Sequence, residues 1–331
     1  MKRAVFLMAL NAMLLTGAGC ARSPEAPEVP AAKKSLTRVS INLNASLTYA
    51  AIVIAKDEGY FADEGIELVP ATLDANAGLA ALVSGKLDVL STGVRAGIFN
   101  MALRGVPIAI VADKSGAKPR ACSAEALVAP PEMARRIAEK GTIRGERMVV
   151  VRGGIAEYLT DMLLRSHGLT EKDVTLVHLP QGAPVAASGE LNAVRYAGEP
   201  TLSTMLREGT AQVVTTSEQL APGRQTTVLV YGKRMLRDDP ELGRRFMRAY
   251  VRGIRRYSEG KTERNLAILS RWTKLPPEVV RNTCWIGVAN DGRIDPKNVQ
   301  PFLDWALEKH YLDGPIATSQ WWNPSFVDSV K

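Results

Sequence analysis

Polar and glycine-rich turns follow several short apolar segments of the chain, and these turns hold the residues best suited to bind a ligand. Arg152, Gly153, Gly154 and Ile155 lie between a predicted strand and a predicted helix. The two glycines free the backbone to point N–H groups at an oxyanion, and Arg152 would add a bidentate contact. We therefore predict an anion site here, with an Arg152 side chain that points to solvent as the alternative.

Two turns in the N-terminal part of the chain offer further ligand contacts. Asn44, Thr48 and Tyr49 follow the first predicted strand and supply short polar groups and a flat aromatic face. Thr48 serves equally well in a helix N-cap, so both roles stay open for it. Thr92 and Gly93 follow the third predicted strand, where a glycine lets a ligand approach the backbone, although a plain strand-to-helix turn explains them as well.

The remaining ligand candidates also lie where predicted strands end, which is where open α/β sheets bind ligands. Asp113 would repel an anion but bind an amine or a ring N–H, unless it is only part of a surface turn. Gly182 follows a strand in the second half of the chain, and Tyr196 and Glu199 lie at the end of the next one. Capping of the following helix is the alternative role of Glu199.

The sequence carries none of the common catalytic motifs. G-x-S-x-G, H-E-x-x-H, C-x-x-C and the dinucleotide fingerprint are all missing, and the triplet 260–262 lacks the earlier glycine of a phosphate loop because Arg255 occupies that position. His167, His178 and His310 are not at ligand spacing from a cysteine, so we expect no metal. These patterns predict a binding protein, not an enzyme, and no cofactor.

The ligand candidates need a sheet to position them, and the chain predicts two. Short β-branched apolar segments alternate with segments of helical period, which favours mostly parallel strands with crossover helices. The expected strands are residues 39–43, 66–70, 88–91, 108–112, 147–151, 174–178, 193–196 and 211–214. The expected helices are residues 48–56, 77–84, 95–104, 156–167 and 200–207, which gives the order βαβαβ twice.

A strand-like segment after residue 226 leads into a helical tail with expected helices at 240–259, 263–273 and 298–309. The tail could form a third domain or return to cover the first unit. We favour the return, because each sheet needs both faces covered. This predicts an α/β protein with lobe 1 at residues 36–128 plus 226–331 and lobe 2 at 129–225. The crossings between lobes should lie near 126–131 and 219–227, where Pro or Gly residues are typical of hinges.

The N-terminus predicts export. Residues 1–20 combine Lys2 and Arg3 with an apolar segment and small residues before Cys20, and they resemble a bacterial lipoprotein signal. An ordinary secretory signal is the alternative. Residues 21–35 are rich in proline and predict a solvated tether. We expect a protein of the periplasm or cell envelope, with lipid on Cys20 as its membrane anchor. Cys122 and Cys284 remain, either as a disulfide or as two buried thiols.

Charge argues against a nucleic-acid partner. The formal net charge of +8 is scattered over arginine-rich helices, with polar and apolar residues between the charges. This pattern is more typical of solvated helix faces than of a nucleic-acid stripe. A mild attraction for anionic ligands or membrane surfaces is the most that it indicates.

Five stretches of the chain together resemble one protein family. The segment 47–69, LTYAAIVIAKDEGYFADEGIELV, resembles the opening signature of the nitrate-, sulfonate- and thiamine-precursor-binding proteins of ABC importers. Four further stretches match in order: LAALVSGKLDVLSTG, SHGLTEKDVTLVHLP, GELNAVRYAGEP and NPSFVDSVK. The resemblance covers roughly residues 38–330. It implies a type II periplasmic binding protein fold, with two α/β lobes joined by two hinge crossings and the ligand in the cleft between them.

The resemblance also implies a function. A lipoprotein of this family captures a small organic solute, such as a sulfonate, nitrate or pyrimidine precursor, by hinge closure and delivers it to permease and ATPase subunits. We expect a monomer. Gly154 and Ile155 replace the family's Ser/Thr-bearing turn, and Ala197 and Gly198 replace the aromatic residue before Glu-Pro. Alternatives are an enzyme of similar fold, of the pyrimidine-precursor or menaquinone-pathway type, and a sensory or envelope lipoprotein.

Overall fold

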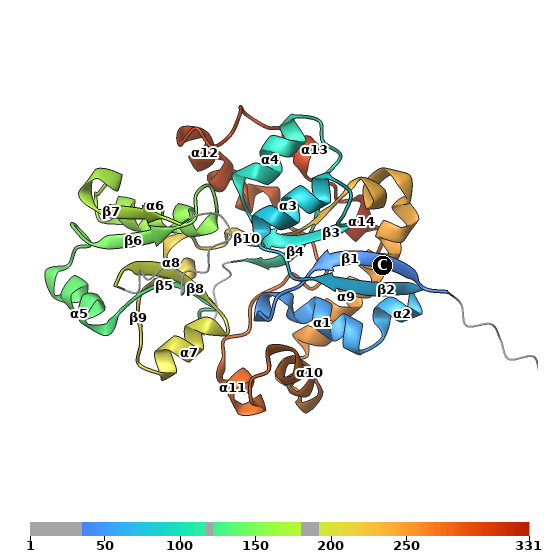
Figure 1. The fold of residues 1–331 in the computed structure, drawn as a ribbon, viewed down its shortest axis with the longest axis horizontal. Helices are drawn as coiled ribbons and strands as arrows, with labels where there is room; N and C mark the ends of the chain where they lie inside the picture. Colours follow the sequence, from blue (N-terminus) through green and yellow to red (C-terminus); the bar gives the residue numbers. More distant parts are fainter. Residues whose placement is uncertain (1–34, 117–121, 180–191, 331) are drawn as a thin grey trace, which may run out of the picture. The chain divides into compact units, whose positions relative to one another are not determined.

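Two five-stranded mixed sheets organise the protein (Figure 1). The structure is a computed structural model that describes residues 35–116, 122–179 and 192–330. The first sheet has the order β2 (Ile66–Ala71), β1 (Thr37–Asn42), β3 (Val89–Gly93), β10 (Gln225–Tyr231) and β4 (Ala109–Gly116). The second has the order β7 (Thr175–His178), β6 (Arg147–Val150), β8 (Val194–Gly198), β5 (Glu125–Ala129) and β9 (Gln212–Thr216).

One strand in each sheet runs against the others. β10 is antiparallel to β3 and β4, and β5 is antiparallel to β8 and β9, while the other pairs are parallel. Both exceptions are the strands that follow a connection between the two sheets. The predicted α/β fold with two lobes is confirmed.

Crossover helices link the parallel strands. Those of the first sheet are α1 (Ala50–Asp57), α2 (Tyr60–Asp63), α3 (Ala75–Val83) and α4 (Ala96–Leu103), with the short 3₁₀ helix η1 (Leu47–Tyr49) before α1. Those of the second sheet are α5 (Pro131–Lys140), α6 (Ile155–Ser166), η2 (Glu171–Asp173), α7 (Thr201–Arg207) and α8 (Ser217–Leu220). At α3 a side-chain cap fixes the start of the helix, because the Asp74 carboxylate accepts the N–H groups of Asn76 and Ala77.

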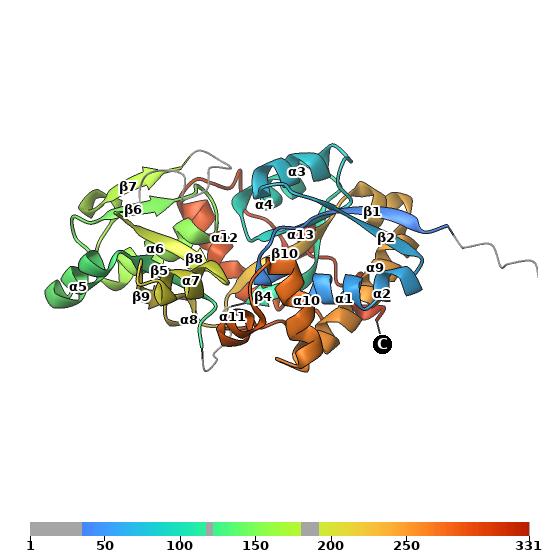
Figure 2. The same cartoon turned by 60° about the horizontal axis from the view of Figure 1, so that its bottom comes forward.

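The C-terminal tail is helical, as predicted. It comprises the π-helical turn η4 (Arg234–Asp238), α9 (Pro240–Ser258), α10 (Glu263–Thr273), α11 (Pro277–Asn282), η5 (Pro296–Asn298), α12 (Gln300–Glu308), α13 (Thr318–Trp321) and α14 (Ser325–Asp328). Figures 1 and 2 show α9 beside α1 and α2, on one face of the first sheet. Arginines on its outer side form ion pairs with α2 and the turn after it, such as Arg252–Asp63 and Arg248–Glu64. The tail therefore returns to lobe 1.

One tail helix contacts both lobes. The Phe302 ring of α12 lies 5.7 Å from the Tyr158 ring of α6 and 6.2 Å from the Phe99 ring of α4, centroid to centroid. Lys309, at the end of α12, forms an ion pair with Asp161 of α6 at 2.9 Å. Figure 2 shows α12 beside α6. The main apolar core, which fills lobe 1, thus continues into lobe 2 through α12.

The second sheet begins earlier than the sequence suggested. We expected a crossing near 126–131 and a lobe boundary at 128, but β5 pairs with β8 and β9 from Glu125 onward. This central strand is buried throughout and lacks alternation, and the Pro130-Pro131 pair behind it suggested a hinge. Pro131 instead occupies the first turn of α5, where its missing N–H is not needed. β10 begins at Gln225, within the expected second crossing.

Cys122 and Cys284 form a disulfide, with their Cα atoms 5.7 Å apart. Cys122 lies just before β5, and Cys284 lies in the tail just after α11. The bond therefore ties the entrance of lobe 2 to the tail that returns to lobe 1, and it resolves the alternatives that the sequence left open.

None of the helices in the described ranges is long and apolar enough to cross a membrane. Cys20 and the proposed tether lie outside those ranges.

Candidate functional site

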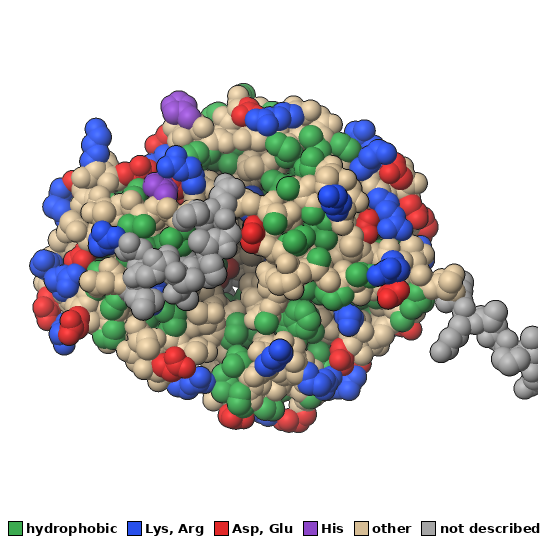
Figure 3. Space-filling model, in the orientation of Figure 1, with side chains coloured by type: hydrophobic (Ala, Val, Ile, Leu, Met, Phe, Trp, Pro, Cys, Tyr) green, Lys and Arg blue, Asp and Glu red, His purple; other side chains and the backbone are tan. Residues whose placement is uncertain are grey.

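A cavity of about 140 Å³ lies between the two lobes, and we call it the cleft cavity. Lobe 1 contributes the end of β3 and the start of α4, and lobe 2 contributes the end of β6 and the start of α6. The surface is hollowed where the lobes meet (Figure 3). The lining residues are Ala75, Thr92, Gly93, Val94, Arg95, Val151, Gly154, Ile155 and Ala156.

The lobes touch directly at the edge of this cavity. The backbone N–H of Ala96 donates to the Gly153 carbonyl at 3.0 Å, and Arg95 pairs with Gly154 in an isolated antiparallel bridge. A Cβ on Gly93 would lie 3.5 Å from the Ile155 side chain. The structure is therefore a closed form, in which the two lobes meet around the cleft cavity.

Arg95 is the charged residue that lines the cavity. Its side chain is 7% exposed, and its Nη1 is buried without a hydrogen-bond partner among the residues that the structure describes. Burial lowers the pKa of the Arg95 guanidinium, and the charge of Asp74 acts in the opposite direction. A buried donor without a hydrogen-bond partner is costly.

The predicted anion site at the start of α6 is occupied by the chain itself. The N–H of Gly153 donates to Glu157 Oε2 at 2.6 Å, and the Tyr311 hydroxyl donates to Glu157 Oε1 at 2.8 Å. The Glu157 side chain is buried, whereas that of Arg152 is exposed. Gly154 and Ile155 line the cleft cavity, the Gly153 N–H already has Glu157 as its acceptor, and the exposed Arg152 is not among the lining residues.

The first predicted turn lies in lobe 1 next to lobe 2. The Ser46 hydroxyl accepts the N–H of Thr48 at 3.3 Å and donates to the Glu199 carbonyl of lobe 2 at 3.2 Å. Ser46, and not Thr48, is therefore the N-cap of η1. The half-buried Asn44 accepts the Trp272 indole N–H on its backbone carbonyl at 3.2 Å. Ser46 therefore contacts lobe 2, Asn44 contacts the tail, and neither Asn44 nor Thr48 lines the cleft cavity.

Tyr49 is buried under a charged group. Lys114 Nζ lies 3.9 Å above the centre of the Tyr49 ring, and the Tyr49 hydroxyl donates to the Ser91 carbonyl at 3.3 Å. Burial raises the pKa of Tyr49 to about 12. The ring face that we predicted to meet a ligand therefore meets the chain's own ammonium group.

Asp113 is neither at the surface nor at the cleft cavity. Its Oδ1 accepts the Gln225 amide at 2.7 Å, and its Oδ2 accepts the backbone N–H of Ala289 at 2.6 Å. At 1% exposure the carboxylate is fully buried. The surface-turn alternative is wrong, and the contacts describe a carboxylate that joins β4 and β10 to the tail.

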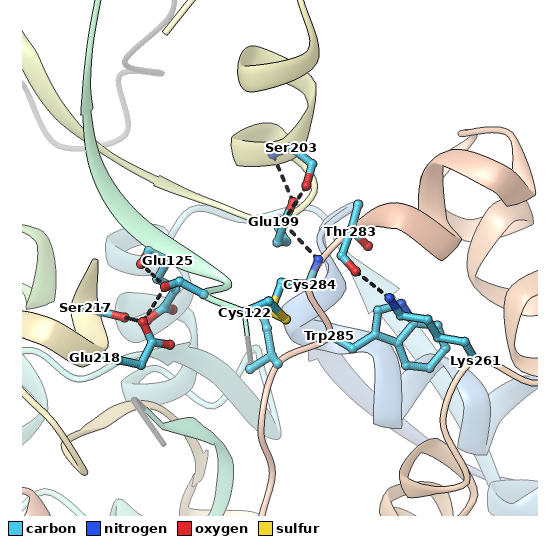
Figure 4. Close-up of a disulfide and its surroundings, with 12 residues drawn as sticks. Cys122, Glu125, Glu199, Ser203, Ser217, Glu218, Lys261, Thr283, Cys284 and Trp285 are labelled. Carbon is cyan, nitrogen blue, oxygen red and sulfur yellow. Dashed lines mark hydrogen bonds between the residues drawn. A yellow bond between two sulfur atoms is a disulfide. The ribbon is translucent and has the colours of Figure 1, made fainter. Parts of the chain in front are cut away.

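Glu199 caps the helix that follows it and also contacts the tail (Figure 4). Its carboxylate accepts the N–H and hydroxyl of Ser203 at 3.1 and 2.6 Å, and the backbone N–H of Cys284 at 3.1 Å. Tyr196 is half-buried in the same region, whereas Gly182 lies outside the described residues. The capping role that the sequence left open for Glu199 is the one its contacts describe.

Two buried charged residues escaped the sequence reasoning because each lies inside a strand. Burial lowers the pKa of the Lys114 ammonium of β4 to about 7, with the charge of Glu125 opposing the change. Burial also raises the pKa of Glu125 in β5, against hydrogen bonds from Tyr196 and Thr226.

Glu125 borders a second, much smaller cavity. Glu125, Glu218 and the disulfide border a space of about 10 Å³. Figure 4 shows the side chains around it. That is space for about one water molecule and not for a substrate. In the described part of the chain, no group of three or more His, Cys, Asp or Glu residues is placed to hold a metal.

Comparison with known proteins gives the family and the fold. The model of the family described as NMT1/THI5 like matches residues 46–259. No curated protein matches the sequence.

Three solved structures illustrate the likeness in fold. The ligand-binding component of an ABC-type import system from Staphylococcus aureus, with zinc bound, is 15% identical with a TM-score of 0.73, covering 89% of this chain and 99% of its own. The alkanesulfonate-binding protein SsuA from Xanthomonas axonopodis pv. citri, bound to MOPS, is 17% identical with a TM-score of 0.68, covering 88% and 100%. The periplasmic nitrate-binding protein NrtA from Synechocystis PCC 6803 is 17% identical with a TM-score of 0.65, covering 89% and 86%.

The TM-scores support the fold, and the matched family model covers more than half of the chain. The chain belongs to the NMT1/THI5-like family.

Proposed function

We propose that the chain is the extracytoplasmic solute-binding component of an ABC importer and that it binds a small organic anion in the cleft cavity. The observation that carries the proposal is the buried, unpartnered Nη1 of Arg95 at a cavity between two lobes. Structures of similar fold include a component of an ABC-type import system, a sulfonate-binding protein and a nitrate-binding protein. An anion that pairs with Arg95 would add to the charge of Asp74 in offsetting the cost of burying the guanidinium.

The cavity limits the size and shape of the solute. Its volume of about 140 Å³ is below the roughly 300–1,000 Å³ of sites for drug-sized ligands, so the solute has few heavy atoms. Val94, Val151 and Ile155 offer apolar walls around the single charged residue. A short apolar body with one anionic group fits this lining best.

Closure of the lobes would trap the solute. The cavity takes walls from both lobes, so a bound solute favours the closed form by its contacts across the cleft. The Ala96–Gly153 hydrogen bond and the Arg95–Gly154 bridge belong to that form. We infer that opening breaks them while the disulfide keeps the entrance of lobe 2 next to the tail.

The remaining parts of the proposal rest on the N-terminal sequence and the family. We infer that the signal before Cys20 is removed and that Cys20 carries the lipid. We further infer that the Pro-rich segment 21–35 tethers the lobes to a membrane of the cell envelope, and that permease and ATPase subunits receive the solute from a monomer. A binding role also fits the small cavity at Glu125, which leaves no room for a substrate beside the perturbed carboxyl group.

A thermal-shift panel tests the proposed function. Alkanesulfonates, short carboxylates, nitrate, amines and pyrimidines are added to wild type, Arg95→Gln and Arg104→Gln. We expect a small anion to stabilise wild type, since a ligand well above its Kd raises the unfolding temperature. Arg95→Gln should lose this response, because the amide carries no charge.

Arg104→Gln is the matched control. Arg95 lies just before α4 and Arg104 lies just after it. Arg104 is exposed and forms an ion pair with Asp313 at 2.8 Å. Its variant should keep the full anion response. Stabilisation by amines alone, or an undiminished anion response in Arg95→Gln, would contradict the proposed function.

A further inference from the structure

The carboxylate of Glu157 lies at the turn before α6. It accepts the Gly153 N–H at 2.6 Å, just before the start of α6, and the Tyr311 hydroxyl at 2.8 Å. Helix N-termini attract anions because their first N–H groups lack partners inside the helix. Gly153 has a φ of 69°, a left-handed conformation that glycine adopts without strain, and this conformation places its N–H in the turn before the helix.

Three features indicate that this carboxylate is held firmly in place. Glu157 is 3% exposed, so it cannot exchange its partners for bulk water while the lobe stays folded. Burial and the nearby Glu157 raise the pKa of Tyr311, which keeps the Tyr311 hydroxyl protonated as a donor. The Tyr311 carbonyl in turn accepts the Asn100 amide of α4 at 2.9 Å, which fixes the donor from the side of lobe 1.

The same turn borders the cleft cavity. Gly154, Ile155 and Ala156 line it opposite Arg95, whose buried Nη1 has no partner in the described part of the chain. The two lobes therefore differ at the cavity. Lobe 1 presents the Arg95 guanidinium, whose Nη1 has no hydrogen-bond partner within the described ranges although the charge of Asp74 acts on the group. Lobe 2 presents the turn before α6, where the Gly153 N–H already has the Glu157 carboxylate as its acceptor.

Resting on the proposed function, we propose that Glu157 is a specificity-determining residue: its carboxylate stands in for an anion at the start of α6, so that the cleft accepts a solute with one anionic group, paired with Arg95. A second anionic group on the solute would meet the negative charge of Glu157 and not free N–H groups. Removal of this carboxylate should turn the Gly153 turn into an anion site.

The test uses formate as the probe and needs no knowledge of the solute. Wild type, Glu157→Ala and Asp161→Ala are titrated with sodium formate at constant ionic strength, and the unfolding temperature and the ¹⁵N–¹H signal of Gly153 are followed. In Glu157→Ala, formate should bind at least tenfold more tightly than in wild type, raise the unfolding temperature and shift the Gly153 signal saturably. If the Glu157 side chain only filled space, added formate would not be expected to restore the stability of Glu157→Ala.

Asp161→Ala is the matched control. Asp161 is a buried carboxylate one turn further along α6, and it pairs with Arg165 at 2.6 Å and with Lys309 at 2.9 Å, away from the cavity. Its variant loses the same charge and should lose stability without gaining a formate response at Gly153. If Glu157→Ala does not fold, Glu157→Ser replaces it, since serine is also much shorter than glutamate and leaves space for formate beside the Gly153 N–H.

The outcomes separate this inference from the proposed function. A formate response confined to the Glu157 variants supports the role of Glu157, even if no solute is found. No response in the Glu157 variants, or an equal response in wild type or Asp161→Ala, overturns it, and leaves the result of the Arg95 panel unaffected.

Discussion

At the scale of single residues, burial decides which cation can recognise a solute. Arg152 and Arg95 both lie at the junction of a strand and a helix, but Arg152 is exposed and Arg95 is 7% exposed. An exposed guanidinium is already hydrated and gains little from an anion, whereas a buried one without a partner gains much. We therefore propose that Arg95, and not Arg152, recognises the solute.

Lys114 gives a prediction for pH dependence. Its pKa is lowered to about 7 in the folded protein, below the 10.5 of an unperturbed lysine. Between these values the unfolded chain binds more protons than the folded one, so this residue makes stability rise with pH from about 7 to about 10, by at most about 1.4 kcal/mol per pH unit. The free energy of unfolding of wild type minus that of Lys114→Met should rise over this range, as measured by urea denaturation.

The matched control for Lys114 is Lys56→Met, which removes an exposed lysine at the end of α1. This variant should leave the pH profile of wild type unchanged. A difference between wild type and Lys114→Met that stays flat from pH 7 to 10 would contradict the account of Lys114.

Sequence reasoning located turns better than it located charges. Four of its candidates, Thr92, Gly93, Gly154 and Ile155, line the cleft cavity, because strand ends and glycines are visible in sequence. The sequence did not indicate Arg95, although it lies only two residues after Gly93. The direction of a long side chain depends on what packs around it, and neither motif nor spacing records this.

At the scale of secondary structure, close packing of helices rests on single positions. A Cβ on Gly253 of α9 would lie 2.3 Å from the Ala51 carbonyl oxygen and 2.6 Å from the Ala55 Cβ of α1. Helix propensity alone predicts that Gly253→Ala stabilises the protein by about 0.5–1 kcal/mol. The clash predicts the opposite sign, a loss of about 1–3 kcal/mol.

Chemical denaturation of Gly253→Ala measures that sign. Arg255→Ala, at an exposed position two residues further along α9, should change the free energy of unfolding by less than about 0.5 kcal/mol. Stabilisation by Gly253→Ala would mean that α1 and α9 are further apart than described.

Most helices and strands could be predicted because their apolar periods are plain. The exception is informative: β5 has five consecutive buried residues, so it shows no alternation, and the Pro130-Pro131 pair after it looked like a hinge. A strand inside a sheet and a buried connection between lobes both appear in a sequence as a short apolar segment, so the pattern alone does not distinguish them. The pairing of β5 with β8 and β9 distinguishes them, and that pairing involves residues some 70 to 90 positions away.

At the scale of the whole molecule, the chain joins its lobes by more than the two connections between sheets. The disulfide links Cys122, before β5, to Cys284, after α11, and α12 packs on both lobes. The sequence left the disulfide open because the separation of two cysteines that are 162 residues apart depends on the finished fold.

Loss of the disulfide should destabilise the folded protein without removing the cleft cavity. The double variant Cys122→Ser/Cys284→Ser should lose about 2–5 kcal/mol in free energy of unfolding, since the bond restricts the unfolded chain. Reduction of wild type should lower its stability by the same amount, and the double variant should not respond to reductant. An unchanged stability on reduction would contradict the presence of the bond.

The central claim is that a small anion binds between the lobes through Arg95. Isothermal titration calorimetry with the anion selected by the thermal-shift panel measures it directly, on wild type and Arg95→Gln at the same salt concentration. The account predicts one site on wild type and binding at least tenfold weaker on Arg95→Gln. Equal affinity for the two proteins would contradict it.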